Sequence, residues 1–143
     1  MNILLLEDSG SVFSFLIEEL EKLGHKIELA TKVSRAIDLM SDEFDNKFDC
    51  LIVDLNINPV GLDYEDLKKS EYEGIWGWEW LKKHVFPKDE NWKKKTIIYS
   101  RYAQILYSKI DKKDYKDVYI VEKNNADDLD LIRTYLKKIE TGL

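Results

Sequence analysis

The residue best placed for chemistry is Asp54, a carboxylate that directly follows the apolar run Cys50–Val53. A run without polar alternation predicts a strand buried on both faces, which is typical of the middle of a parallel sheet. In open α/β sheets the functional crevice lies at the carboxyl ends of the strands. We therefore predict that a rigid strand delivers Asp54 to such a crevice, although Asp alone is also a common turn residue.

Polar residues also lie at or just after the carboxyl ends of three other predicted strands. Glu7 and Asp8 follow the first strand, Ser100 follows the fourth and Lys123 closely follows the fifth. Because the carboxyl ends of parallel strands meet at one edge of a sheet, we expect all of these residues to share one crevice with Asp54. Each residue alone has an ordinary structural explanation, but all of them together do not.

Carboxylates gathered in one crevice repel each other unless a cation neutralises them. Oxygen ligands without His or Cys favour Mg²⁺ over zinc. A divalent ion there would also accept phosphate oxygens, so that Asp54 could attack phosphorus as a nucleophile and form an acyl phosphate. Lys123 would neutralise charge on the transferred group, and Ser100 would donate a hydrogen bond to it.

The elements that must position these residues alternate along the chain. Five segments predict strands: residues 2–6, 26–30, 50–53, 96–99 and 118–121. Helical spacing of apolar residues predicts helices over residues 12–23, 33–40, 77–85 and 103–110, and from residue 126 almost to the end. This alternation predicts an α/β fold, a doubly wound five-stranded parallel sheet.

An aromatic cluster lies in the third of these helices. Gly74 and Gly77 bracket it. Trp76 and Trp80 are four residues apart, so we expect them to share the buried face of the helix, with Trp78 turned elsewhere. We interpret the cluster as core packing rather than as a ligand platform.

Composition limits the class of protein. The 143 residues are 44% hydrophobic and carry a net charge of -6, which predicts one domain over residues 1–143 and argues against nucleic-acid binding. The lysine runs 93–95 and 112–113 are flanked by acids and are interpreted as solvated faces. The single cysteine, Cys50, is expected to be a buried apolar residue. The N-terminal apolar run lacks the features of a signal peptide or membrane span, so we expect a cytoplasmic protein without membrane contact.

These motifs, taken in order, resemble those of response-regulator receiver domains of two-component systems, the CheY-like superfamily. The resemblance covers essentially the whole chain except for about residues 58–75, which form an enlarged loop after the phosphoacceptor strand. The segments that carry it are Leu4–Asp8, Leu51–Asp54, Ile97–Ser100 and Val121–Lys123.

The resemblance implies a flavodoxin-like receiver fold with strand order 2-1-3-4-5. It implies a stand-alone receiver, a phosphoprotein that takes a phosphoryl group on Asp54 from a histidine kinase or phosphotransfer protein. Mg²⁺ would be held by Glu7, Asp8, Asp54 and the backbone carbonyl of Asn56. Such a domain catalyses its own phosphorylation and dephosphorylation without conventional turnover. We expect output through an unidentified partner protein, a homodimer or onward transfer in a phosphorelay.

The sequence departs from the receiver pattern at several places. Pro59 comes one position late, and the loop around it is longer by roughly a dozen residues than a usual βα connection. Arg101 stands where the family favours a small residue. Asn124 replaces the usual proline after the lysine, so no cis peptide is expected there. Ile120 occupies the position of the usual aromatic switch residue.

Two other functions compete with this interpretation. The enlarged loop, Arg101 and Asn124 are also consistent with a phosphorylation-independent receiver-like interaction module. A phosphohydrolase of the haloacid-dehalogenase type would need a second Asp two residues after the nucleophile. Here that position is Asn56, which disfavours this class of enzyme.

Overall fold

The structure is a computed structural model, and it describes residues 1–41, 47–63, 75–123 and 126–142. Five parallel strands form one sheet in the order β2-β1-β3-β4-β5, which confirms the predicted topology. The strands are β1 (Asn2–Leu6), β2 (Lys26–Ala30), β3 (Cys50–Val53), β4 (Thr96–Ser100) and β5 (Tyr119–Glu122). The segment at residues 26–30, expected near the edge, is indeed one of the two edge strands.

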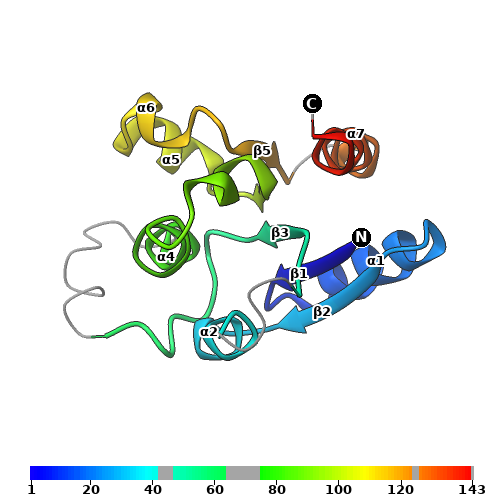
Figure 1. The fold of residues 1–143 in the computed structure, drawn as a ribbon, viewed down its shortest axis with the longest axis horizontal. Helices are drawn as coiled ribbons and strands as arrows, with labels where there is room; N and C mark the ends of the chain where they lie inside the picture. The colour runs from blue at the N-terminus through cyan, green and yellow to red at the C-terminus, as the bar shows by residue number, and fades with distance from the viewer. Residues whose placement is uncertain (42–46, 64–74, 124–125, 143) are drawn as a thin grey trace.

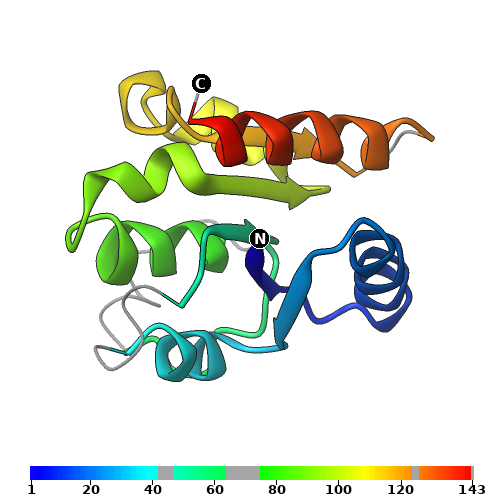
Figure 2. The same cartoon turned by 45° about the vertical axis from the view of Figure 1, so that its right-hand side comes forward.

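Helices cover both faces of this sheet (Figure 1). One face carries α1 (Gly10–Lys22) and α7 (Asp128–Thr141), and the other carries α2 (Val33–Leu39), α4 (Trp76–Trp80) and α5 (Ala103–Lys109). Two short helices, η3 (Glu90–Lys95) and α6 (Lys112–Tyr115), precede β4 and β5 and were not predicted. Figure 2 shows α7 lying along the β5 edge of the sheet.

The core consists of two layers separated by the sheet. Along β1, Ile3 and Leu5 pack against the α1 and α7 face, whereas Leu4 and Leu6 pack against the α2 and α4 face. This alternation follows from the pleat, which turns successive side chains to opposite faces. Both layers are apolar, so the sequences of the central strands are continuous hydrophobic runs. Cys50 is fully buried and unoxidised, as predicted.

The aromatic cluster differs from its prediction. Trp78, expected to turn elsewhere, is buried at 2% exposure and contacts Phe86 edge to face at a centroid distance of 5.7 Å. Trp80 is also buried, whereas Trp76 is only partly so. The π-helix η2 (Leu81–Val85) continues α4, and residues 77–81 are all buried, so more than one side of this helix is covered. A simple amphipathic pattern therefore does not predict that Trp78 is buried together with Trp80.

The first part of the enlarged loop is fixed to α2 by backbone hydrogen bonds. The amides of Val33 and Ser34 donate to the carbonyls of Asn58 and Val60 at 3.1 and 2.6 Å. These amides belong to the first turn of α2, which has no side-chain cap. Gly61 approaches Ser34 with a φ of 113°, a conformation that favours glycine. Residues 64–74, the rest of the predicted insertion, lie outside the described residues.

Candidate functional site

The backbone amides of three candidate residues are hydrogen-bonded to the neighbouring strand. The amide of Glu7 donates to Ala30 O at 3.0 Å, that of Asp54 to Leu6 O at 2.9 Å, and that of Lys123 to Ser100 O at 3.1 Å. These bonds continue the parallel ladders one residue past the strands. The carboxyl edge of the sheet therefore fixes the backbone positions from which these three side chains extend.

Three carboxylates meet at this edge. Glu7, Asp8 and Asp54 each place an oxygen within 4.8 Å of the others. Glu7 and Asp54 are buried, at 1% and 7% exposure, whereas Asp8 is exposed. A buried pair of like charges is costly unless a cation or a proton compensates it.

Lys123 supplies that compensation. Its Nζ donates to Glu7 Oε1 and to Asp54 Oδ2, the latter at 3.0 Å. The lysine side chain is itself only 8% exposed, so the pairing is shielded from water. Lys123 also lies over the ring of Tyr99, at 5.3 Å from its centroid. The ammonium group thus stands among two carboxylates and an aromatic face, all of which favour a cation.

The remaining carboxylate oxygens accept backbone hydrogen bonds. Glu7 Oε2 accepts from the amides of Asp8 and Ser9 at 3.1 and 3.3 Å, and Asp54 Oδ1 accepts from the amide of Asn56 at 3.3 Å. Burial and the neighbouring Asp54 charge raise the pKa of Glu7 to about 7, although Lys123 opposes this shift. Glu7 therefore gains a proton near neutral pH.

A cavity of about 240 Å³ opens over these groups. Its lining comes from four strand ends and the start of α1: Asp8, Ser9, Val12, Asp54, Asn56, Arg101, Tyr102 and Lys123. Arg101 is exposed and brings a second cation to this cavity. The space accommodates a small anion beside Asp54 and Lys123.

Ser100 lies next to this cavity rather than among its lining residues. The side chain is fully buried at the end of β4, and its Oγ accepts a hydrogen bond from the amide of Tyr102 at 3.0 Å. The hydroxyl proton remains available for donation. The sequence therefore placed Ser100 on the right strand end, and its predicted role requires the hydroxyl to reach the cavity.

The chemistry of the donors fits Mg²⁺. Glu7, Asp8 and Asp54 offer hard carboxylate oxygens close together, and Asn56 lies beside them in the cavity lining. Lys123 already pairs with two of the three carboxylates, so a metal would bind against the charge of this ammonium group.

Gly77 is a site residue that sequence reasoning missed. Its amide donates to Leu55 O at 2.9 Å, and a Cβ at this position would lie 2.1 Å from Asp54 O. The helix α4 thus presses directly on the backbone of the candidate nucleophile. The only signal was a glycine within an aromatic helical segment, which is an unfavourable helix residue unless close packing requires it.

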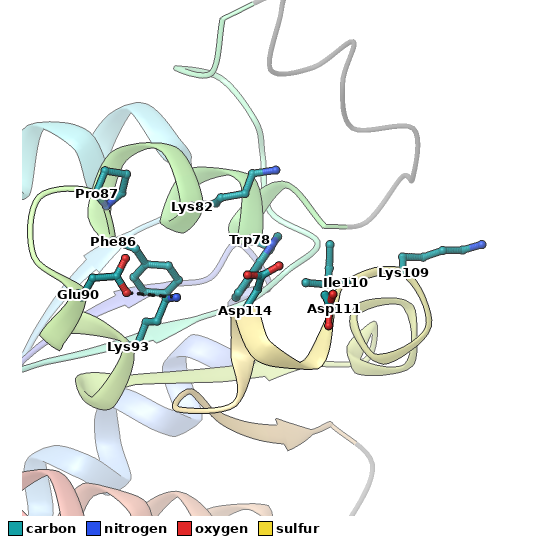
Figure 3. Close-up of a pocket in the computed structure, with 10 residues that line it drawn as sticks. All are labelled: Trp78, Lys82, Phe86, Pro87, Glu90, Lys93, Lys109, Ile110, Asp111 and Asp114. Carbon is teal, nitrogen blue, oxygen red and sulfur yellow. Dashed lines mark ion pairs between the residues drawn. The ribbon is translucent and has the colours of Figure 1, made fainter.

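A second cavity, of about 320 Å³, lies away from this site (Figure 3). Trp78 and Phe86 of the α4–η2 helix line one side, and Asp111 and Asp114 near α6 line another. An ion pair between Lys93 and Glu90 crosses its rim. Lys82, a further lining residue, pairs with Glu79.

Comparison with known proteins identifies the fold. No family model matches the chain, and no curated protein matches its sequence. Among solved structures, the HemR receiver domain of Leptospira biflexa matches at a TM-score of 0.68 and 18% identity, covering 96% of this chain and 92% of that one.

The response regulator TrrA of Thermotoga maritima, in complex with Mg²⁺–BeF, matches at a TM-score of 0.65 and 22% identity, covering 96% and 97%. TrrA also matches in a complex with the histidine kinase ThkA, at 0.64 and 23%, again covering 96% and 97%. The matches span nearly the full length of both chains. The chain therefore has the flavodoxin-like fold of response-regulator receiver domains, as its motifs predicted.

Proposed function

We propose that this chain is a receiver domain that accepts a phosphoryl group on Asp54 in a Mg²⁺-dependent reaction. The observation that carries the proposal is the joint placement of three carboxylates and Lys123 at one cavity on the carboxyl edge of the sheet. Structural neighbours with the same fold, one of them in a complex with Mg²⁺–BeF, support it.

In this reaction a carboxylate oxygen of Asp54 attacks the phosphorus of the donor and forms a new P–O bond. The P–N bond of a donor phosphohistidine breaks, and its electron pair stays on the imidazole nitrogen. The amide of Asn56, bonded to Oδ1, restricts rotation of the Asp54 carboxylate. The side chain therefore meets the donor in a limited range of orientations.

Lys123 neutralises charge on the transferred group. Its Nζ already lies 3.0 Å from Asp54 Oδ2, so a phosphoryl group on Asp54 arrives within reach of the ammonium. The hydroxyl of Ser100 donates a hydrogen bond to a phosphoryl oxygen, and exposed Arg101 adds a second cation at the cavity.

Glu7, Asp8 and Asp54 would hold Mg²⁺, together with the backbone carbonyl of Asn56. When bound, the metal would neutralise charge on the phosphoryl oxygens. Glu7 must be deprotonated for this role, which links metal binding to its raised pKa.

The phosphoryl donor is a histidine kinase or a phosphotransfer protein. Support comes from the fold shared with TrrA, which is known in a complex with the histidine kinase ThkA. Phosphorylation adds charge of about -1.5 to -2 and new acceptor oxygens, which would draw Ser100 and Lys123 inward. The faces of α5, β5 and α7 would then change affinity for an output partner or a second copy.

The test is labelling with ³²P-acetyl phosphate in the presence and absence of Mg²⁺. We expect wild-type protein to be labelled only with Mg²⁺, and Asp54→Asn to lose labelling while it keeps its melting temperature. Asp49→Asn is a matched control. Asp49 lies outside the cavity, and its Oδ2 accepts a hydrogen bond from the backbone amide of Asn2. Undiminished labelling of Asp54→Asn would exclude Asp54 as the phosphoacceptor.

One observation favours the alternative, a phosphorylation-independent interaction module. Lys123 pairs with both Glu7 and Asp54, so part of their negative charge is compensated without a metal. Calorimetry with Mg²⁺ and beryllofluoride separates the two functions. Binding that depends on Asp8 and Asp54 supports the receiver, and absence of binding in folded protein supports the module.

A further inference from the structure

A groove at the opposite end of the sheet from Asp54 has a volume of about 510 Å³. It lies among η3, the turn between α6 and β5, and the last turn of α7, whose end Figure 2 shows beside that turn. η3 precedes β4 and Val118 precedes β5, so the groove is at the amino ends of these strands. It is therefore separated from the cavity by roughly 16 Å, the length of a five-residue strand.

Four lysines line this groove, which we call the lysine groove: Lys94, Lys95, Lys116 and Lys138. All four are exposed, and the groove includes one carboxylate, that of Asp117. The sequence separates these lysines into three segments, so their convergence is visible only in the fold. The acids that flank the run 93–95 in the sequence do not line the groove. Its carboxylate, that of Asp117, comes from a different segment.

No carboxylate of a described residue forms an ion pair with any of these four lysines. Two of them instead lie over aromatic rings, Lys95 over Trp92 at 5.5 Å and Lys138 over Tyr135 at 5.8 Å. The cavity of Figure 3 is different, because its Lys93 and Lys82 are paired with Glu90 and Glu79. The lysine groove therefore holds an excess of positive charge, four lysines against Asp117, on a chain whose net charge is -6.

Interaction with a helix dipole explains the position of only some of these lysines. Lys138 stands in the last turn of α7, where a cation is favourable. Lys116 follows α6, which is a single turn long, and Lys94 and Lys95 close a 3₁₀ helix. Four like charges at one groove repel each other, so an anion bound there would relieve this repulsion.

We propose that the lysine groove binds a short acidic segment of a partner protein, with an apolar side chain of that segment against the groove floor. The floor supplies apolar contacts through Val118, Tyr119 and Ile139, which are buried or partly buried. Lysines act as separate point charges without the fixed fork of arginine, and this suits carboxylates spread along a peptide. Positive charge beside apolar surface thus defines an acidic and partly apolar ligand.

The remaining surface argues against a nucleic acid as the ligand. Specific protein–nucleic acid interfaces extend over about 600 Å² or more, even for a single module. Outside the lysine groove the chain carries a large excess of acidic residues, because the whole chain has 28 acids and 22 bases. The net charge of the chain therefore opposes a long polyanion more than a peptide of a few residues.

The test measures fluorescence anisotropy of a fluorescein-labelled peptide of alternating Asp and Glu with a central Leu. The groove variant is Lys116→Glu with Lys138→Glu. The matched control is Lys26→Glu with Lys32→Glu, two exposed lysines on the β2 side of the sheet that give the same net charge. A Lys116→Gln, Lys138→Gln variant removes charge without adding acids, and thermal melts establish that every variant is folded.

We expect wild-type and control protein to bind the peptide and the groove variant to bind at least tenfold more weakly. A peptide with Asn and Gln in place of the acids should also bind at least tenfold more weakly. Binding should weaken between 0.05 and about 0.5 M salt, where the screening length falls to roughly 4 Å. Beryllofluoride binding should stay unchanged in the groove variant, since Asp54 lies at the other end of the sheet.

Three results would overturn the proposal. The first is absence of peptide binding to wild-type protein at low salt. The second is equal loss in the groove and control variants, which would mean that only net charge matters. The third is tighter binding of a labelled twelve-nucleotide single-stranded DNA than of the peptide, lost in the groove variant, which would make the groove a nucleic-acid site.

Discussion

Gly77 stands so close to Asp54 that a Cβ on Gly77 would lie 2.1 Å from the Asp54 carbonyl oxygen and 3.0 Å from Val53 Cγ1. The contact is with backbone at the start of the candidate nucleophile's loop, which cannot swing aside as a flexible side chain can. We expect Gly77→Ala to displace the loop of Asp54, lower the free energy of unfolding by about 1–3 kcal/mol and weaken beryllofluoride binding at least tenfold. Urea unfolding and calorimetry measure the two effects.

Gly10→Ala is the matched control for this substitution. Gly10 also lies in the first turn of a helix, but its nearest heavy atom would be Phe13 Cζ at 3.8 Å, an ordinary contact. We expect Gly10→Ala to be neutral or to stabilise by up to about 1 kcal/mol, because alanine is the better helix former. Similar effects of the two substitutions would show that close packing at Gly77 does not position Asp54.

The sequence predicted the features that depend on strand ends and missed those that depend on packing between elements. Asp54 could be placed because its strand is a continuous apolar run, and the parallel topology then brought Glu7 and Lys123 beside it. Trp78 was expected to turn away from the buried face of its helix, because periodicity cannot show that a helix is covered on several sides. Gly77 and the anchoring of Asn58 to α2 depend on loop lengths and close backbone approach, which no periodic pattern encodes.

Lys123→Met tests the ion pairs at the carboxylate cluster. Without the ammonium, Glu7 and Asp54 become an uncompensated buried pair, so we expect the metal-free protein to lose about 3–5 kcal/mol of stability. Mg²⁺ affinity should rise, because the metal no longer competes with a neighbouring cation, while labelling of Asp54 should fall. Calorimetry and melts with and without Mg²⁺ follow these changes. Lys93→Met, which breaks a more exposed pair with Glu90, should alter neither Mg²⁺ affinity nor labelling.

The raised pKa of Glu7 predicts a pH dependence of stability. Burial favours the protonated form, so the folded protein binds this proton up to about pH 7, whereas the unfolded chain releases it near its ordinary pKa of 4.5. The stabilising contribution is complete below about pH 4.5 and is lost as the pH rises through about 7. We expect the melting temperature of metal-free protein to fall between pH 5 and 8 through this group, and Glu7→Gln to flatten that part of the curve.

Mg²⁺ should reverse this trend, since its binding requires ionised Glu7. The rise in melting temperature on adding Mg²⁺ should be larger at pH 8 than at pH 6 in wild-type protein. In Glu7→Gln the metal-induced rise should be small at both pH values. A pH profile that is the same in wild-type and Glu7→Gln protein would mean that Glu7 is not the titrating group.

Tyr99 connects the surroundings of Lys123 to α7. Its hydroxyl donates to Asp128 Oδ2 at 3.0 Å, while its ring lies under the Lys123 ammonium. Burial and hydrogen bonding together raise the pKa of Tyr99, so the phenol stays a donor across the physiological range. We expect Tyr99→Phe to cost about 1–2 kcal/mol of stability and to loosen the first turn of α7. Amide hydrogen exchange at residues 128–131 measures that loosening.

A double-mutant cycle isolates this contact, because Asp128→Asn also affects other interactions of Asp128. The coupling energy between Tyr99→Phe and Asp128→Asn should be about 1 kcal/mol. If the contact transmits the state of the site, beryllofluoride should change exchange at the start of α7 in wild-type protein and change it less in Tyr99→Phe. Because Tyr99→Phe keeps the ring under Lys123, beryllofluoride affinity itself should stay within about twofold. Equal exchange responses in both proteins would place the route to α7 outside Tyr99.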